Sequence, residues 1–152
     1  MTNKQKNEKY ADLITKMKTA IDNEFYYEAI LIEYAILEDR TESLLRHAKL
    51  NTKDEYNKEY KLHQKIQILR KNAKYYDTYI KKHLTDELLV SINNWKSNRN
   101  TIIHNLVNIS YSNNEIKKIA LDGYKIIKNL NNKSTLINKY LDKKYQNLRK
   151  IS

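Results

Sequence analysis

Apolar residues recur along this chain at intervals of three and four, the spacing that places side chains on one face of an α-helix. The first such stripe consists of Tyr10, Leu13, Ile14, Met17 and Ile21. The second, in a helix predicted from about residue 24 to about residue 50, consists of Phe25, Ala29, Ile32 and Ile36. The third consists of Leu62, Ile66, Leu69, Ala73, Tyr76 and Ile80. The first half of the chain is therefore predicted to be almost entirely helical.

Capping signals divide the second half of the chain. The Thr-Asp-Glu sequence at 85–87 is typical of a helix N-terminus and predicts a fourth helix that ends near residue 109. Ser112-Asn-Asn-Glu115 matches a capping box and predicts a fifth helix. We expect Asn131 and Asn132 to end that helix before a last one, whose stripe consists of Leu136, Tyr140, Leu141 and Leu148.

The composition excludes several classes of protein. Pro is absent and Gly occurs once, so a P-loop or a dinucleotide-binding fingerprint is excluded. Cys is also absent, which excludes disulfides, thiolate zinc sites and cysteine nucleophiles. No apolar run has the character of a signal peptide or a membrane span, so we expect a soluble, cytoplasmic protein. We predict an all-α fold: a compact up-down bundle of five to six helices that forms a single domain over residues 1–152.

The chain is strongly basic, with a formal net charge of +11. Of its 29 Lys and Arg residues, 5 are Arg and the remaining 24 are Lys. One interpretation is a solvated lysine surface that reflects codon usage. The other is a nucleic-acid partner, because lysines attract phosphates and the 13 Tyr side chains could stack on bases. Charge alone leaves both interpretations open.

The predicted second helix changes character halfway along its stripe. The direction taken by its apolar residues is continued by Asp39, Arg40, Ser43 and His47. These residues either form a polar pocket at one end of the bundle or mark a helix end that emerges into solvent, since burial of such groups is costly unless they are paired.

In the predicted fourth helix, Arg99 lies near the centre of the apolar face. A buried guanidinium needs a partner, such as a carboxylate, a second subunit or a bound phosphate. Asp39 is the expected carboxylate and Glu42 the alternative, unless Arg99 extends along its aliphatic stem to solvent. Asn100 and His104 are four residues apart and share one face of the helix. For His104, a solvated position on a polar face is the competing interpretation.

The segment Arg99-Asn100-Thr-Ile-Ile-His104 resembles the Arg-Asn-x-x-x-His motif of the HEPN superfamily. This resemblance implies a small all-α domain, metal-independent endoribonuclease activity and a symmetric dimer whose two motifs face each other across one cleft. The subgroup paired with nucleotidyltransferase antitoxins usually has Tyr two residues after the His, where this chain has Leu106. The abortive-infection-like or CRISPR-effector-like branch is therefore the better match.

The residue types suit this chemistry. An imidazole titrates near pH ~6.5 and can transfer protons, whereas a guanidinium can hold phosphate oxygens in a bidentate manner. We expect His104 to act as the acid or base, Arg99 to bind the phosphate and Asn100 to orient either His104 or the phosphate. We place Asp39, Arg40, Ser43 and His47 in a supporting polar pocket.

The expected partners are an RNA substrate, a second copy of the chain and a neutralising antitoxin or sensor protein. We expect no cofactor, and no metal either, because the His residues at 47, 63, 83 and 104 lack the spacing of metal ligands. The alternative function is a non-catalytic basic module that binds RNA or a protein.

Overall fold

The computed structural model describes residues 1–52, 57 and 59–151, and within them it is all-helical, without a strand. The helices are α1 (Asn3–Asp22), α2 (Tyr26–Arg46), α3 (Leu62–Lys71), the 3-10 helix η1 (Ala73–Tyr75), α4 (Thr78–His83), α5 (Asp86–Asn105) and α6 (Asn113–Ile151). The prediction of an all-α protein is therefore confirmed.

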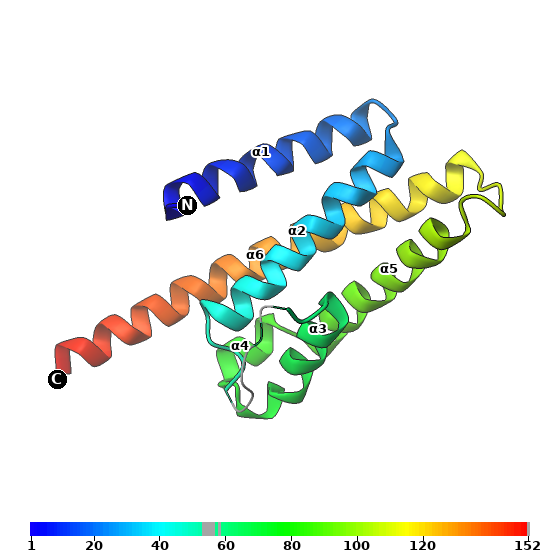
Figure 1. Ribbon diagram of the computed structural model, residues 1–152. Helices are drawn as coiled ribbons and strands as arrows, with labels where there is room; N and C mark the ends of the chain where they lie inside the picture. The colour runs from blue at the N-terminus through cyan, green and yellow to red at the C-terminus, as the bar shows by residue number, and fades with distance from the viewer. Residues whose placement is uncertain (53–56, 58, 152) are drawn as a thin grey trace.

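Four long helices, α1, α2, α5 and α6, lie alongside one another and alternate in direction along the chain (Figure 1). The helix α2 packs mainly on α6 and α1, and α6 also contacts α5 and α4. The shorter helices α3 and α4 lie between the end of α2 and the start of α5. This is the compact up-down arrangement that the sequence predicts. Among the described helices, none has both the length and the apolar character needed to cross a membrane.

Two of the predicted caps are present in the structure. The Thr85 hydroxyl accepts a hydrogen bond from the Leu88 N–H at 3.2 Å and begins α5. Before α6, the Glu115 N–H donates to the Ser112 hydroxyl and the Ser112 N–H donates to the Glu115 carboxylate. These hydrogen bonds lower the pKa of Glu115. Caps are predictable because they involve residues only three positions apart.

The predicted third helix is not continuous, because α3 ends at Lys71 and α4 begins only at Thr78. At this break the side chain of Asn72 is buried and donates to the Ile68 carbonyl at 2.9 Å, which competes with the backbone ladder. The Asp77 carboxylate then accepts from the Ile80 N–H at 3.0 Å and caps α4. The predicted second and fourth helices are also shorter than expected, since they end at Arg46 and Asn105.

The predicted break at Asn131 and Asn132 is wrong, because α6 runs through both residues without interruption. The Tyr10 hydroxyl of α1 donates to the Asn131 side chain. On either side of the pair, Leu130 and Ile137 continue the buried face of the helix. Packing thus outweighs the few tenths of a kcal/mol by which each Asn disfavours a helix. The side chain of Leu148, assigned to the last stripe, lies outside the described part of the chain.

The buried face of α2 is rotated relative to the predicted stripe. Ala29 and Ile36 are buried as expected, but Phe25 is 61% exposed and Ile32 is only half-buried. The buried residues of α2 that the predicted stripe omits are Tyr26, Ile30, Glu33, Leu37, Thr41, Leu44 and Leu45. This correction matters because it places a carboxylic acid in the centre of the core.

Glu33 is 0% exposed, and neither of its carboxyl oxygens has a hydrogen-bond partner. Its side chain lies against Gly123 of α6, the single glycine of the chain. A Cβ atom at Gly123 would lie 1.9 Å from Glu33 Oε2 and 2.8 Å from Trp95 Nε1. Burial, together with the nearby negative charge of Asp122, raises the pKa of Glu33 to about 9. At neutral pH the core therefore holds a protonated acid.

We expect Glu33→Gln to change how stability depends on pH. The unfolded carboxyl ionises near its ordinary pKa of 4.5, whereas the folded one stays protonated until about pH 9. Between these values the free energy of unfolding falls by up to about 1.4 kcal/mol per pH unit as the pH rises. Gln cannot ionise, so urea unfolding should show the variant gaining about 4 kcal/mol over the wild type between pH 5 and pH 8. Parallel pH profiles for the two proteins would contradict this expectation.

We also expect Gly123→Ala to destabilise the fold. In an exposed helix interior this change stabilises by about 1 kcal/mol, but here the methyl group collides with the Glu33 carboxyl. The expected loss is about 2 kcal/mol in chemical unfolding. In a Glu33→Ala background the collision with the carboxyl is removed, so a double-mutant cycle should show strong coupling. Additive effects would show that Glu33 does not occupy this space.

Candidate functional site

Arg99 is half-buried on the inner side of α5, between the buried residues Trp95 and Ile102. Its guanidinium carbon lies 4.3 Å from the centre of the Tyr34 ring of α2, which is the geometry of a cation–π contact. Its Nη1 donates to the Asn100 side-chain oxygen at 3.0 Å, while its Nε is buried without a hydrogen-bond acceptor. The guanidinium is thus held by an aromatic ring and an amide, neither of which neutralises its charge.

The expected pairing of Arg99 with Asp39 is not present. The Asp39 carboxylate instead pairs with the adjacent Arg40 at 2.5 Å, and the Arg40 guanidinium lies 4.2 Å from the centre of the Tyr10 ring of α1. Tyr34 and Asp39 are five residues apart, which is about 140° around α2. Asp39 therefore belongs to the flank of α2 near α1, whereas Tyr34 faces α5.

The other two residues of the predicted supporting pocket also lie on that flank of α2. Ser43 is half-buried, and its carbonyl accepts from the backbone N–H of His47 where the helix ends. His47 itself is exposed. Asp39, Arg40, Ser43 and His47 therefore lie apart from the contacts of Arg99. Of these four residues, Asp39 and His47 are exposed, whereas Arg40 and Ser43 are half-buried.

Arg99 contacts Tyr34 and Asn100, and Glu38 and Lys65 continue this set of polar residues along α2 and α3. We call the set the α2–α5 polar cluster: Tyr34, Glu38, Lys65, Arg99 and Asn100. Glu38 lies one turn after Tyr34 on α2 and pairs with Lys65 of α3 at 3.5 Å. Lys65 is only 2% exposed, so this ion pair reaches into the core. Burial raises the pKa of Tyr34; the negative charge of Glu38 adds to this effect and the positive charge of Arg99 opposes it.

Sequence reasoning missed Tyr34, Glu38 and Lys65. Tyr34 fits an apolar helix pattern, and Glu38 follows it in a run of charged residues that looks like a solvent face. The burial of Lys65 could have been predicted, because this residue lies within the third apolar stripe, three residues after Leu62 and four before Leu69. A lysine at such a position needs an acidic partner within reach of its ammonium group.

His104 lies one turn after Asn100, close to the end of α5, and its side chain is exposed. Arg99 and His104 are separated by about 140° around the helix. The guanidinium therefore faces inward while the imidazole faces solvent. Two apolar residues adjoin the imidazole along the chain, Leu106, which is 42% exposed, and Val107, which is 96% exposed.

Two surface cavities of the described chain lie elsewhere. One of about 310 Å³ lies between the start of α2 and the start of α6. The other, of about 470 Å³, lies along the first half of α1 and is lined by Met1, Gln5, Glu8, Lys9 and Asp12. Neither cavity includes Arg99, Asn100 or His104.

Comparison of the chain with models of protein families, with curated proteins and with solved structures found no match.

The surroundings of Arg99 predict that it contributes little to stability. In Arg99→Met the cation–π contact is lost, but the buried Nε, which costs about 1–3 kcal/mol when unpaired, is also removed. We therefore expect the free energy of unfolding to change by less than about 1 kcal/mol, or to rise. The matched control is Ile102→Ala on the same face, which should lose about 2–4 kcal/mol. A loss in Arg99→Met as large as that of the control would show that Arg99 is mainly a structural residue.

Proposed function

We propose that this chain is an endoribonuclease that cleaves RNA by attack of the 2′-hydroxyl on the adjacent phosphate, without a metal ion. The observation that carries the proposal is the way in which the Arg99 guanidinium is held. Its guanidinium is positioned by Tyr34 and Asn100, keeps a free positive charge and lies five residues before an exposed imidazole. A positioned guanidinium that keeps its charge supports recognition of a phosphate, and the imidazole of the same motif can move a proton once a second copy of the chain brings it to that phosphate.

Each residue has a distinct role in this reaction. Arg99 binds the non-bridging oxygens of the scissile phosphate and stabilises the charge that develops on them. His104 exchanges the proton of the 2′-hydroxyl or of the leaving 5′-oxygen. Asn100 contacts Arg99 and holds the guanidinium in one orientation. The products are a 2′,3′-cyclic phosphate and a 5′-hydroxyl.

A second copy of the chain completes the site in this proposal. The reaction needs one group to accept a proton and another to donate one, whereas each chain supplies one imidazole at the motif. The apolar side chains Leu106, Val107 and Ile109 follow His104 closely and are exposed. Such a patch is typical of a surface that is covered by another protein. A symmetric dimer through this region would bring two Arg99–His104 pairs together.

The biological role that fits this activity is that of a toxin or an abortive-infection effector in the cytoplasm, controlled by a neutralising antitoxin or a sensor protein. The resemblance to the HEPN motif carries this part of the proposal. The net charge of +11 supports a polyanionic substrate, because a basic surface increases the rate of encounter with RNA.

The proposal predicts that Arg99→Ala and His104→Ala each lower the rate of RNA cleavage by more than ~10²-fold. The measurement is cleavage of a labelled single-stranded RNA in buffer with EDTA, with circular dichroism to check that helix content is retained. His83→Ala is the matched control, since His83 lies in α4 beside Tyr79 and should retain activity. Equal cleavage by the wild type and both motif variants would contradict the assignment.

A non-catalytic module that binds RNA or a protein is the second candidate. It is favoured by the exposed position of His104 near the end of α5. Under this alternative, RNA binding weakens steeply as salt is raised and no product forms at any salt concentration. Arg99→Ala and His104→Ala would then bind RNA much as the wild type does.

A further inference from the structure

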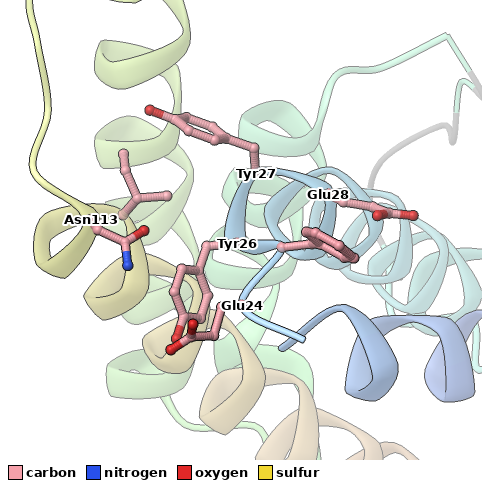
Figure 2. A pocket seen from close by; sticks show the side chains of 7 residues that line it. Glu24, Tyr26, Tyr27, Glu28 and Asn113 are labelled. Atoms are coloured by element: carbon pink, nitrogen blue, oxygen red, sulfur yellow. The ribbon is translucent and has the colours of Figure 1, made fainter. Parts of the chain in front are cut away.

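The cavity at the start of α2 is separate from the Arg99 motif and has a different chemical character. It is lined by five consecutive residues at the corner between α1 and α2, and by two residues of the first turn of α6: Glu24, Phe25, Tyr26, Tyr27, Glu28, Asn113 and Ile116. Figure 2 shows Glu24 beside the Tyr26 ring, Asn113 facing them from α6, and Glu28 at the opposite edge. The cavity, of about 310 Å³, can hold one long side chain or a small molecule.

Aromatic rings are exposed in this cavity to an unusual degree for a core-forming sequence. Phe25 is 61% exposed and Tyr27 is 43% exposed, whereas Tyr26 is buried and forms the wall. Phe25 occupies the N-cap position of α2 and provides no capping hydrogen bond. Ser, Thr, Asp or Asn would serve the helix better there. Helix formation therefore does not account for an aromatic side chain at this position.

The charge of the cavity is opposite to that of the rest of the molecule. Lys and Arg outnumber Asp and Glu by 29 to 18, yet no basic residue lines this cavity and two glutamates do. Among the described residues, neither the Glu24 nor the Glu28 carboxylate is in an ion pair or a side-chain hydrogen bond. Both carboxylates are thus available to a ligand.

Glu24 also occupies a backbone conformation that disfavours it. Its φ angle is 61°, in the left-handed region. The Phe25 N–H donates to the Ala20 carbonyl and the Glu24 N–H donates to the Ile21 carbonyl, which is the Schellman pattern that ends a helix. Gly or Asn is preferred at this position, and another residue costs about 1 kcal/mol. The chain therefore carries a carboxylate here at the expense of stability.

We propose that this cavity binds an alkylammonium or guanidinium group on an apolar stem. Aromatic faces attract a cation, carboxylates form charge-assisted hydrogen bonds with it, and the carbonyl of an amide such as Asn113 accepts a further N–H. The apolar stem would cover the rings of Phe25 and Tyr27. Two sources supply this chemistry, a Lys or Arg side chain of a protein partner and a free polyamine. The proposal stands independently of the nuclease assignment.

The test is an NMR titration of the full-length ¹⁵N-labelled chain with three probes: Nα-acetyl-lysine methylamide, spermidine and the neutral Nα-acetyl-norleucine methylamide. We expect both cationic probes to shift the backbone amides of residues 24–28 and 113–116, and the neutral probe to do so at least tenfold more weakly. Tighter binding of the lysine derivative than of spermidine identifies a protein side chain as the ligand, and the reverse order identifies a polyamine. Equal shifts with the neutral probe would overturn the proposal.

Two double variants distinguish binding of a cation in this cavity from nonspecific attraction of cations to surface carboxylates. Glu24→Asn with Glu28→Gln removes both carboxylates, keeps a residue that accepts the left-handed backbone and should weaken binding of the cations roughly tenfold. The matched control is Glu8→Gln with Asp12→Asn, which removes two carboxylates from the cavity on α1 that has no aromatic lining. This control should leave the titration unchanged. Equal weakening in both double variants would overturn the proposal, and thermal unfolding checks that each variant is folded.

Discussion

A neutral carboxylic acid at the centre of the bundle determines how three of its helices can approach one another. Glu33 of α2 fits against Gly123 of α6 and beside Trp95 of α5 because no side chain projects from Gly123. Trp95 in turn donates to the Ile119 carbonyl of α6 at 2.9 Å. Because Tyr34 follows Glu33 and Arg99 lies one turn after Trp95, this contact also sets the register that places the Tyr34 ring over the Arg99 guanidinium. The core and the candidate site therefore depend on the same alignment.

Several polar groups buried between α2 and the neighbouring helices α3, α5 and α6 reduce the stability of the fold. Glu33 and the Nε of Arg99 are buried without hydrogen-bond partners, while Lys65 is buried in an ion pair with Glu38. Apolar residues of similar volume would be equally stable or more stable at such positions. Polar groups retained at positions that apolar residues could fill are expected at a site whose chemistry is under selection. The proposed role of Arg99 accounts for one of them.

The sequence was informative wherever the structure depends on neighbours three or four residues away. The caps at Thr85 and at Ser112–Glu115 and the inward position of Arg99 follow from local spacing. Features that depend on a distant residue could not be predicted in this way: Asn131 remains helical because Tyr10 contacts it, although 121 residues separate them. The partner of Arg99 was missed for the same kind of reason, since an aromatic ring is indistinguishable from an ordinary core residue in a hydrophobic pattern.

The length of α6 limits which mutations the fold can accept. Its 39 residues form one uninterrupted helix. Gly123 of this helix contacts Glu33, and further along it the Tyr140 hydroxyl donates a hydrogen bond to the carboxylate of Asp77, the N-cap of α4. Loss or gain of a single residue between Gly123 and Tyr140 would turn everything beyond it by about 100° and shift it by about 1.5 Å. The hydroxyl of Tyr140 would then point away from Asp77 while Gly123 stayed in place. The fold can therefore tolerate point substitutions on the outer face of this helix far better than an insertion or deletion within it.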